Sequence, residues 1–157
     1  MSHEASPAHS LERVTEDNLT DVVALAREYC RFNGVECSDA ALLALFRALV
    51  ADPAREGVQF LARDATGRAA GFATLVWSWA TWATGRIGIM ADLYVAAHAR
   101  RRGIAQTLIE ACHAECRMRG ARGLTWSTAE DNAPARALYD RVGAQSRTNW
   151  VDYWLDS

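Results

Sequence analysis

The 157-residue chain lacks several features that mark common functional classes. It has no apolar run near the roughly 20 residues that cross a bilayer, so we expect no membrane span. Basic residues do not dominate: 17 stand against 19 acidic ones, and a net charge of −2 argues against a nucleic-acid binder. The polar N-terminus has no apolar signal core. We therefore expect a cytoplasmic protein with a flexible tail over residues 1–9.

Cysteine and histidine do not occur at the spacing of a metal site. The four cysteines, Cys30, Cys37, Cys112 and Cys116, form no Cys-x-x-Cys pair, and the four histidines are scattered. His113 lies between two cysteines but points off the helix stripe that carries them. We expect no metal, and we interpret the cysteines as reduced, small hydrophobic side chains.

Composition and periodicity predict one globular domain over residues 10–157. Half of the residues are hydrophobic and 23% are charged, which is typical of a folded domain with a sizeable core. Hydrophobic spacing and turn residues predict strands at 11–15, 58–63, 69–79, 87–95, 124–128 and 150–155, and helices at 19–32, 38–52, 104–119 and 132–142. This order predicts an α/β fold with a mixed, mostly antiparallel sheet flanked by helices.

The strand expected at 87–95 carries one charged residue among hydrophobic ones. Simple alternation places Met90, Asp92 and Tyr94 on one face of this strand. The other face then carries Ile87, Ile89, Ala91, Leu93 and Val95.

An arginine cluster and a glycine join this strand to the helix that begins at Ile104. The N-terminus of a helix has unpaired N–H groups and a partial positive charge, so it attracts anions. Gly103 lets the backbone approach a ligand closely, and Ala105 adds little bulk. The side chains of Arg100–Arg102 are equally consistent with a solvated turn when taken alone. Taken together, residues 100–105 favour a cradle, that is, a binding site for a phosphate or pyrophosphate group.

Two motifs resemble those of the GNAT N-acetyltransferase superfamily. Its acyl-CoA signature, Arg/Gln-x-x-Gly-x-Gly/Ala after a strand, is matched by Arg100-Arg101-Arg102-Gly103-Ile104-Ala105. Its Asn-x-x-Ala-x-x-Leu/Phe-Tyr segment, followed by Gly-Phe/Ala, is matched by Asn132 to Tyr139 and then Gly143-Ala144. The spacing and the order of elements agree from Leu11 onward, which implies a GNAT-like fold.

The resemblance implies acetyl-CoA as co-substrate. Backbone groups of Leu93 and Val95, on either side of Tyr94, would bond the pantetheine arm as if it were a further strand. Amides from Arg101 to Ala105 would hold the pyrophosphate, and the arginine side chains would add charge-assisted contacts. The implied cofactor-binding residues are Leu93, Tyr94, Val95, Arg100, Arg101, Arg102, Gly103, Ile104, Ala105, Asn132, Ala135 and Tyr139.

Acetyl transfer to an amine requires a base, because an alkylamine with a pKa of about 10.4 is protonated at neutral pH. Asp92 is the candidate for the base or for an amine contact, since a carboxylate on an apolar strand is costly unless it is paired or functional. A pair with a nearby arginine is the structural alternative. The Val95 N–H is a candidate donor to the negative charge that develops during transfer.

Tyr139 is the candidate general acid that protonates the departing thiolate. The alternative is a core aromatic on a helix face with its hydroxyl satisfied locally. Glu28 and Tyr29, late in the first helix, fall where the family lines its acceptor pocket, although Glu28 could equally face solvent.

The acceptor is less defined than the donor. Asp92 to Val95, the second motif and a late Trp150 look most like the diamine (spermidine/spermine-type) branch. That branch has a second acidic residue just before the aspartate, and here the position is Ala91. We therefore expect a small primary amine, diamine or amino-acid-like. The alternatives are a protein or peptide acetyltransferase and a non-catalytic acyl-CoA sensor. A homodimer is also expected, because the apolar C-terminal strand would leave an edge that invites pairing.

Overall fold

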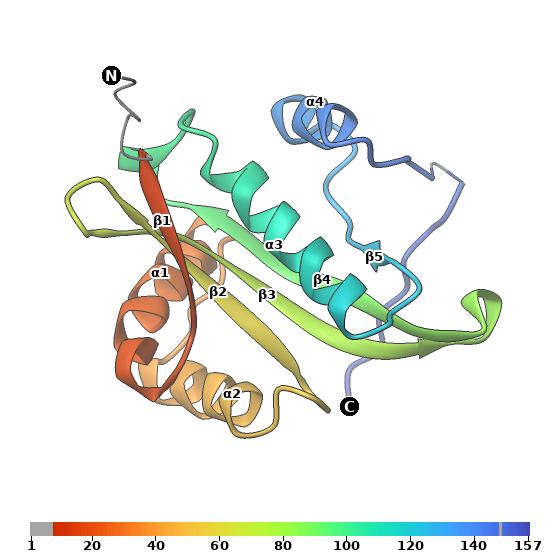
Figure 1. The fold of residues 1–157 in the computed structure, drawn as a ribbon, viewed down its shortest axis with the longest axis horizontal. Coiled ribbons are helices and arrows are strands. Elements are labelled where there is room, and N and C mark those ends of the chain that lie inside the picture. The colour runs from red at the N-terminus through yellow and green to blue at the C-terminus, as the bar shows by residue number, and fades with distance from the viewer. Residues whose placement is uncertain (1–7, 148) are drawn as a thin grey trace, which may run out of the picture. The chain divides into compact units, whose positions relative to one another are not determined.

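A computed structural model describes residues 8–147 and 149–157, which divide into two compact units between Trp126 and Ser127 (Figure 1). The predicted tail lies largely outside the described residues. The strands are β1 (His9–Arg13), β2 (Gly57–Asp64), β3 (Ala69–Ala80), β4 (Gly85–Val95) and β5 (Leu124–Thr125). The helices are α1 (Leu19–Phe32), α2 (Asp39–Ala51), α3 (Ile104–Met118) and α4 (Ala133–Arg141).

The first unit contains a five-stranded sheet in the order β1-β2-β3-β4-β5. Every neighbouring pair is antiparallel except β4 and β5, which run parallel. Helices α1 and α2 pack on one face of the sheet, and α3 packs on the opposite face (Figure 1). The sequence-based expectation of an α/β fold with a mixed, mostly antiparallel sheet is confirmed.

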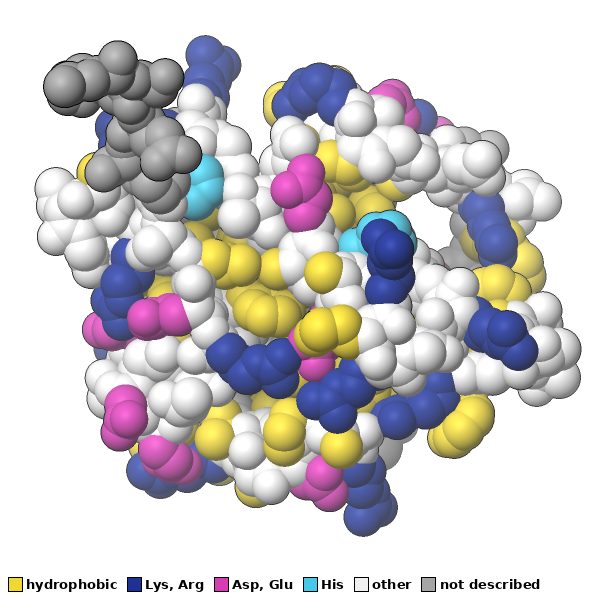
Figure 2. Space-filling model, viewed as in Figure 1, with side chains coloured by type: hydrophobic (Ala, Val, Ile, Leu, Met, Phe, Trp, Pro, Cys, Tyr) yellow, Lys and Arg dark blue, Asp and Glu magenta, His cyan; other side chains and the backbone are white. Residues whose placement is uncertain are grey.

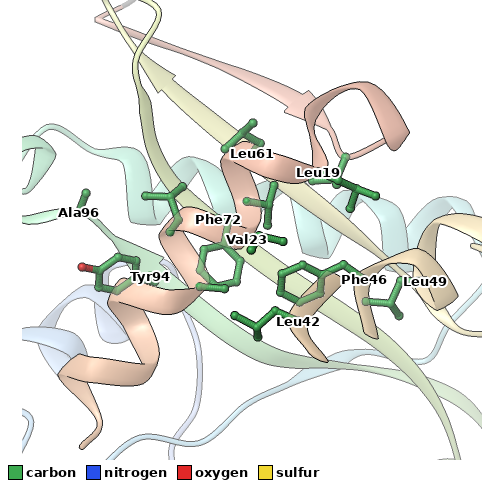
Figure 3. Close-up of a cluster of buried hydrophobic side chains, with 13 residues drawn as sticks. Leu19, Val23, Leu42, Phe46, Leu49, Leu61, Phe72, Tyr94 and Ala96 are labelled. Atoms are coloured by element: carbon green, nitrogen blue, oxygen red, sulfur yellow. The ribbon is translucent and has the colours of Figure 1, made fainter. Parts of the chain in front are cut away.

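A cluster of buried hydrophobic side chains lies between the sheet and the helices α1 and α2 (Figure 3). Phe72 on β3 is fully buried and lies at the centre of the cluster, with Phe46 of α2 and Tyr94 of β4 at ring-centroid distances of 6.4 and 6.3 Å. On the opposite face, α3 buries a stripe that includes Ile104 and Leu108. These two layers hold β4 firmly from both sides.

The expectation that all four cysteines are reduced is wrong for Cys30 and Cys37, which form a disulfide. Cys30 is near the end of α1, and the turn after Phe32 reverses the chain, so that the Cα atoms of the pair are 6.3 Å apart. Spacing alone did not indicate this reversal. Cys112 and Cys116 are free and buried on α3, as expected, and burial raises their pKa values to about 12 and about 11.

The strand expected at 150–155 does not form. No strand occurs among the described residues of the second unit, whose regular element is α4. The hydrophobic side chains of the segment, such as Tyr153 and Leu155, are more than 90% exposed. Alternating hydrophobic residues predict only a propensity, and a strand also needs a hydrogen-bonding partner.

No described helix is long and apolar enough to span a membrane.

Candidate active site

A bulge in β4 corrects the predicted faces of this strand. Thr74 pairs with Asp92 and the next residue, Leu75, pairs with Met90, so Ala91 is the extra residue on β4. A bulge of this kind re-aims the side chains beyond it. Asp92 and Tyr94 therefore lie on the α1/α2 face, whereas Met90 lies on the α3 face. The alternation that grouped Met90 with Asp92 is wrong at this point.

The second edge of β4 is open along the residues that follow the bulge. Among the described residues, β5 pairs with β4 only at Gly88 and Ile89. The Ala96 N–H donates to the Ala70 carbonyl across β3, at 2.8 Å. Because hydrogen-bonding directions alternate along an antiparallel strand, the backbone groups of Leu93 and Val95 face away from β3, toward the open edge. The strand thus presents a short template for one further extended chain.

The loop between β4 and α3 bends through two residues in the left-handed region. Arg101 has φ 62° and Gly103 has φ 78°. Gly103 is the N-cap of α3 and has no side chain to satisfy the first amides of the helix. A Cβ at Gly103 would come no closer than 4.0 Å to another atom, the His9 Cε1, so the space beside these amides is open.

Arg100, Arg101 and Arg102 are all exposed, but Arg100 already has protein partners. Its Nε donates to the Val95 carbonyl at 3.1 Å, and its guanidinium lies 5.5 Å from the ring centre of Phe32 at the end of α1. Ile104 is buried beneath the cradle and Ala105 is half-buried. The pyrophosphate-binding roles of these residues stay predictions.

Asp92 is the half-buried carboxyl group of this region. Burial raises the pKa of Asp92 above its ordinary value, and a hydrogen bond from Thr74 partly offsets that rise. No arginine contributes to the shift, so the alternative of an arginine pair finds no support in its surroundings. A carboxylate with a raised pKa beside an open strand edge is typical of a proton-transfer site.

Tyr94 and the last turns of α1 form the surroundings of Asp92 on the same face. The Tyr94 hydroxyl donates to Glu28 Oε2 at 3.3 Å. Burial first, and then the Glu28 charge, raise the pKa of Tyr94, so this phenol stays protonated at neutral pH. The Tyr29 ring centre lies 5.7 Å from that of Tyr94 and 6.0 Å from that of Phe72, so packing accounts for its position. The hydrogen bond between Tyr94 and Glu28 is a contact that the sequence did not suggest.

The residues of the second motif lie in the second unit. Asn132 caps α4, accepting from the Ala135 N–H at 3.3 Å, and its Nδ2 donates to Thr128 Oγ1 at 3.2 Å. Tyr139 is half-buried on α4. The cap explains why the motif begins with asparagine at this point. The cofactor and general-acid roles of these residues stay predictions.

Charged side chains of both signs are interspersed on the face that carries α3 (Figure 2). Glu115 is buried on this helix and pairs with Arg13 and Arg119.

No group of three or more His, Cys, Asp or Glu side chains that could hold a metal occurs within the described part of the chain.

Comparison with known sequences identifies the class of this protein. The sequence model of the Acetyltransferase (GNAT) family matches residues 20–144. The chain belongs to this family of acetyltransferases and is an enzyme that uses acetyl-CoA.

Its relatives include both sequences and solved structures. An uncharacterized N-acetyltransferase, YhfO of Bacillus subtilis (strain 168), is 34% identical over 101 residues, which cover 64% of this chain and 67% of the relative. A thialysine N-epsilon-acetyltransferase of Caenorhabditis elegans is 26% identical over 147 residues, which cover 91% of this chain and 89% of the relative. The crystal structure of a probable acetyltransferase has a TM-score of 0.82 and 25% identity, covering 94% of this chain and 97% of its own.

The features of the first unit fit acetyl-CoA. The open edge of β4 offers the amides of Leu93 and Val95 to an extended amide-containing arm, and the space at Gly103 lets an anion reach the N-terminus of α3. When bound, acetyl-CoA supplies an acetyl group already activated as a thioester.

Replacing Gly103 with alanine should weaken acetyl-CoA binding by roughly threefold or more, because the left-handed backbone that aims the first amides of α3 would be strained. Isothermal titration of acetyl-CoA measures this. Gly120→Ala is the matched control: φ is +67° at the other end of α3, and nothing lies within 4 Å of the added Cβ. Both variants should unfold more easily by about 1 kcal/mol. Equal affinities in the two would contradict a cradle at Gly103.

Proposed function

We propose that this acetyltransferase transfers the acetyl group to a primary amine of a small, positively charged molecule, with Asp92 as the general base. The observation that carries the proposal is the half-buried Asp92 carboxyl, with its raised pKa, on the same face as the Tyr94–Glu28 hydrogen bond. Two carboxylates on one side of β4 favour a cationic acceptor. The relative whose name gives the ε-amine of thialysine as acceptor is consistent with this substrate class.

The proposed roles follow from ordinary proton chemistry. The ionised Asp92 carboxylate accepts a proton from the ammonium group of the acceptor, so that the nitrogen lone pair becomes available. The Glu28 carboxylate holds a second positive charge of the acceptor, and the Tyr94 hydroxyl orients Glu28. The Val95 N–H donates to the negative charge that develops on the transferred carbonyl. Tyr139 Oη holds the proton that neutralises the leaving sulfur.

A thiol-release assay with acetyl-CoA and an acceptor panel tests the proposal. The panel contains a monoamine, α,ω-diamines, lysine, thialysine and a lysine-containing peptide. We expect turnover with diamines or amino-acid amines to exceed turnover with the peptide. Turnover with the peptide alone would favour a protein acetyltransferase, and tight binding without turnover of any amine would favour a sensor. The chain contains no lysine, so its own side chains add no lysine-acetylation background.

Glu28→Gln should raise KM for a diamine by roughly two- to fivefold, because an exposed charge pair contributes about 0.2–1 kcal/mol. The same substitution should leave KM for a monoamine of equal length unchanged. Glu110→Gln is the control, since Glu110 is an exposed carboxylate on α3, on the opposite side of the sheet. Steady-state kinetics on both acceptors gives the comparison. Equal effects on the two acceptors would remove Glu28 from the amine site.

We further propose that the enzyme acts as a homodimer in the cytoplasm. The exposed hydrophobic side chains at 150–155 support self-association, which sedimentation velocity measures directly. The Cys30–Cys37 disulfide of the structure bears on this location, because cellular thiols reduce such pairs in the cytoplasm. Thiol trapping in intact cells, followed by mass spectrometry, reports the state of the pair.

A further inference from the structure

Three polar side chains form a line across the α1/α2 face of the sheet, one from each of three adjacent strands. Gln59 on β2 pairs in register with Thr74 on β3, and Thr74 pairs with Asp92 on β4. Directly paired residues on adjacent strands have side chains on the same face. Gln59 is 2% exposed and Thr74 is 4% exposed. The line therefore runs from the interior of the sheet to the candidate base.

The hydrogen bonds along this line have a defined direction. Gln59 Nε2 donates to Thr74 Oγ1 at 2.9 Å, so this oxygen acts as an acceptor toward Gln59. A threonine hydroxyl has a single hydrogen to donate. With Gln59 as donor, that hydrogen is left for Asp92, which is directly paired with Thr74 across the sheet, and a hydroxyl hydrogen bond favours the ionised carboxylate. Gln59 thus fixes the direction in which Thr74 acts.

This arrangement of buried polar groups makes the free energy of folding less favourable. Gln59 and Thr74 occupy buried positions on a face where neighbours such as Leu61 and Phe72 are hydrophobic. The Gln59 Oε1 atom is buried and has no hydrogen-bond partner among the described residues. An unsatisfied buried acceptor is unfavourable, and hydrophobic residues of similar volume would avoid it. A structural role alone does not explain why both polar side chains are present.

We propose that Thr74 and Gln59 are positioning residues that hold the Asp92 carboxylate ionised and oriented for proton transfer from the acceptor. The proposal rests on the proposed function of Asp92. Neither residue touches the acceptor: Thr74 acts through its bond to Asp92, and Gln59 acts through Thr74. They oppose the effect of burial, which favours the protonated carboxyl, the form that cannot act as a base.

Other charged groups near this face do not replace the Thr74 hydroxyl. Glu28 accepts from Tyr94, and the Arg100 guanidinium lies near the same phenol. Further charged side chains on α1 and α2 form ion pairs elsewhere: Asp21 with Arg63, Arg27 with Asp39, and Arg47 with Glu16. Among the described residues, the Thr74 hydroxyl is the group that lowers the pKa of Asp92.

The direct test is a carbon-13 NMR titration of aspartate carboxyl groups in the enzyme without substrate, with Asp92→Asn used to assign the resonance. In Thr74→Val the pKa of Asp92 should rise by roughly one pH unit, since a lost hydrogen bond to a charged group is worth about that much. Thr74→Ser should restore the wild-type value. Gln59→Met should give a smaller rise, because the hydroxyl is then free to turn away.

Kinetics then link the titration to turnover. In Thr74→Val the acidic limb of the kcat/KM pH profile should move to higher pH, by the same amount as the pKa of Asp92 measured by NMR. Ser78→Ala removes a hydroxyl from the same face of β3 and should leave both unchanged. An unaltered pKa of Asp92 in Thr74→Val and Gln59→Met would overturn the inference. If the NMR value moves but Asp92→Asn keeps the acidic limb, the assignment of Asp92 as base is wrong instead.

The stability of the same variants separates positioning from packing. Gln59→Met should unfold at a denaturant concentration equal to or above that of the wild type, because it removes the unsatisfied Oε1 atom. Thr74→Val should lose about 1–3 kcal/mol, because it leaves the buried Gln59 Nε2 without its acceptor. A loss of stability in both, with an unchanged pKa of Asp92, would show that the two residues are structural. If Thr74→Val does not fold, Gln59→Met alone still carries the titration.

Discussion

Replacing Asp92 with asparagine should lower kcat/KM by roughly 10²- to 10⁴-fold, the usual range for loss of a general base. Asparagine has nearly the same shape but cannot accept the proton of an ammonium group. The acidic limb of the pH profile should disappear with it. In the wild type that limb lies above the ordinary range of an aspartate, because burial raises the pKa of Asp92. Steady-state assays between pH 5 and 9 measure both effects.

The same substitution should stabilise the protein at neutral pH. The pKa of Asp92 is raised in the folded state, so the folded protein holds this proton more tightly than the unfolded chain. Near the ordinary pKa of aspartate and below, wild type and Asp92→Asn should differ little. As pH rises through the raised pKa, only the wild type must keep a desolvated charge, and its relative stability falls. Urea unfolding at acid and neutral pH measures the difference.

Opposite changes in activity and stability distinguish a catalytic carboxylate from a structural one. Asp92→Glu is the control, since it keeps the charge and should retain part of the activity. If Asp92→Asn lost stability at neutral pH together with activity, the carboxylate would have to be a structural hydrogen-bond acceptor. A wild-type rate in Asp92→Asn would transfer the role of base to another group or to water.

Local signals in the sequence predicted most of the fold. The helix boundaries at Ser38 and Asn132 follow from side chains that cap the adjacent amides. The left-handed turn before α3 follows from Gly103. Each of these features depends on residues within one turn of chain, so periodicity and cap chemistry suffice. The family motif also predicted acetyl-CoA as the acetyl donor, because its glycine and arginines are contiguous in the sequence.

The rest of the candidate site depends on register between distant strands. Both faces of the strand from Ile87 to Val95 carry hydrophobic residues, so alternation alone cannot reveal the extra residue at Ala91. Gln59 and Thr74 looked like ordinary strand residues, because their meaning comes from pairing across the sheet. The Cys30–Cys37 disulfide likewise depends on a turn that no residue spacing specifies. Non-local geometry is therefore where sequence reasoning failed.

Gly88 is a second position whose importance is visible only in three dimensions. It lies on β4 where β5 pairs with it, on the face that α3 covers. A Cβ at this position would lie 2.4 Å from Cys116 Sγ and 2.8 Å from Leu75 Cδ1, and both neighbours are buried. Real Cβ contacts are not this short, so α3 must move away or the side chains must leave their rotamers.

Gly88→Ala should therefore lower the free energy of unfolding by about 1–3 kcal/mol, the range for overpacking in a core. Denaturant unfolding measures it. Gly123→Ala is the matched control, because Gly123 is the hydrogen-bond partner of Gly88 yet has nothing within 4 Å of its added Cβ. That control should change stability by less than about 0.5 kcal/mol. Equal stability of Gly88→Ala and wild type would contradict the close approach of α3 to β4.

The Gly88→Ala/Cys116→Ala double variant identifies the contact itself. Removing the sulfur opens the space that the new methyl group needs, so the double variant should be more stable than the sum of the two single effects, by at least about 0.5 kcal/mol. Because α3 also begins at Gly103, a displacement of this helix would move its first amides relative to the open edge of β4. Acetyl-CoA affinity should fall in Gly88→Ala and recover in the double variant. Recovery of stability without recovery of affinity would separate the packing of α3 from the binding of the donor.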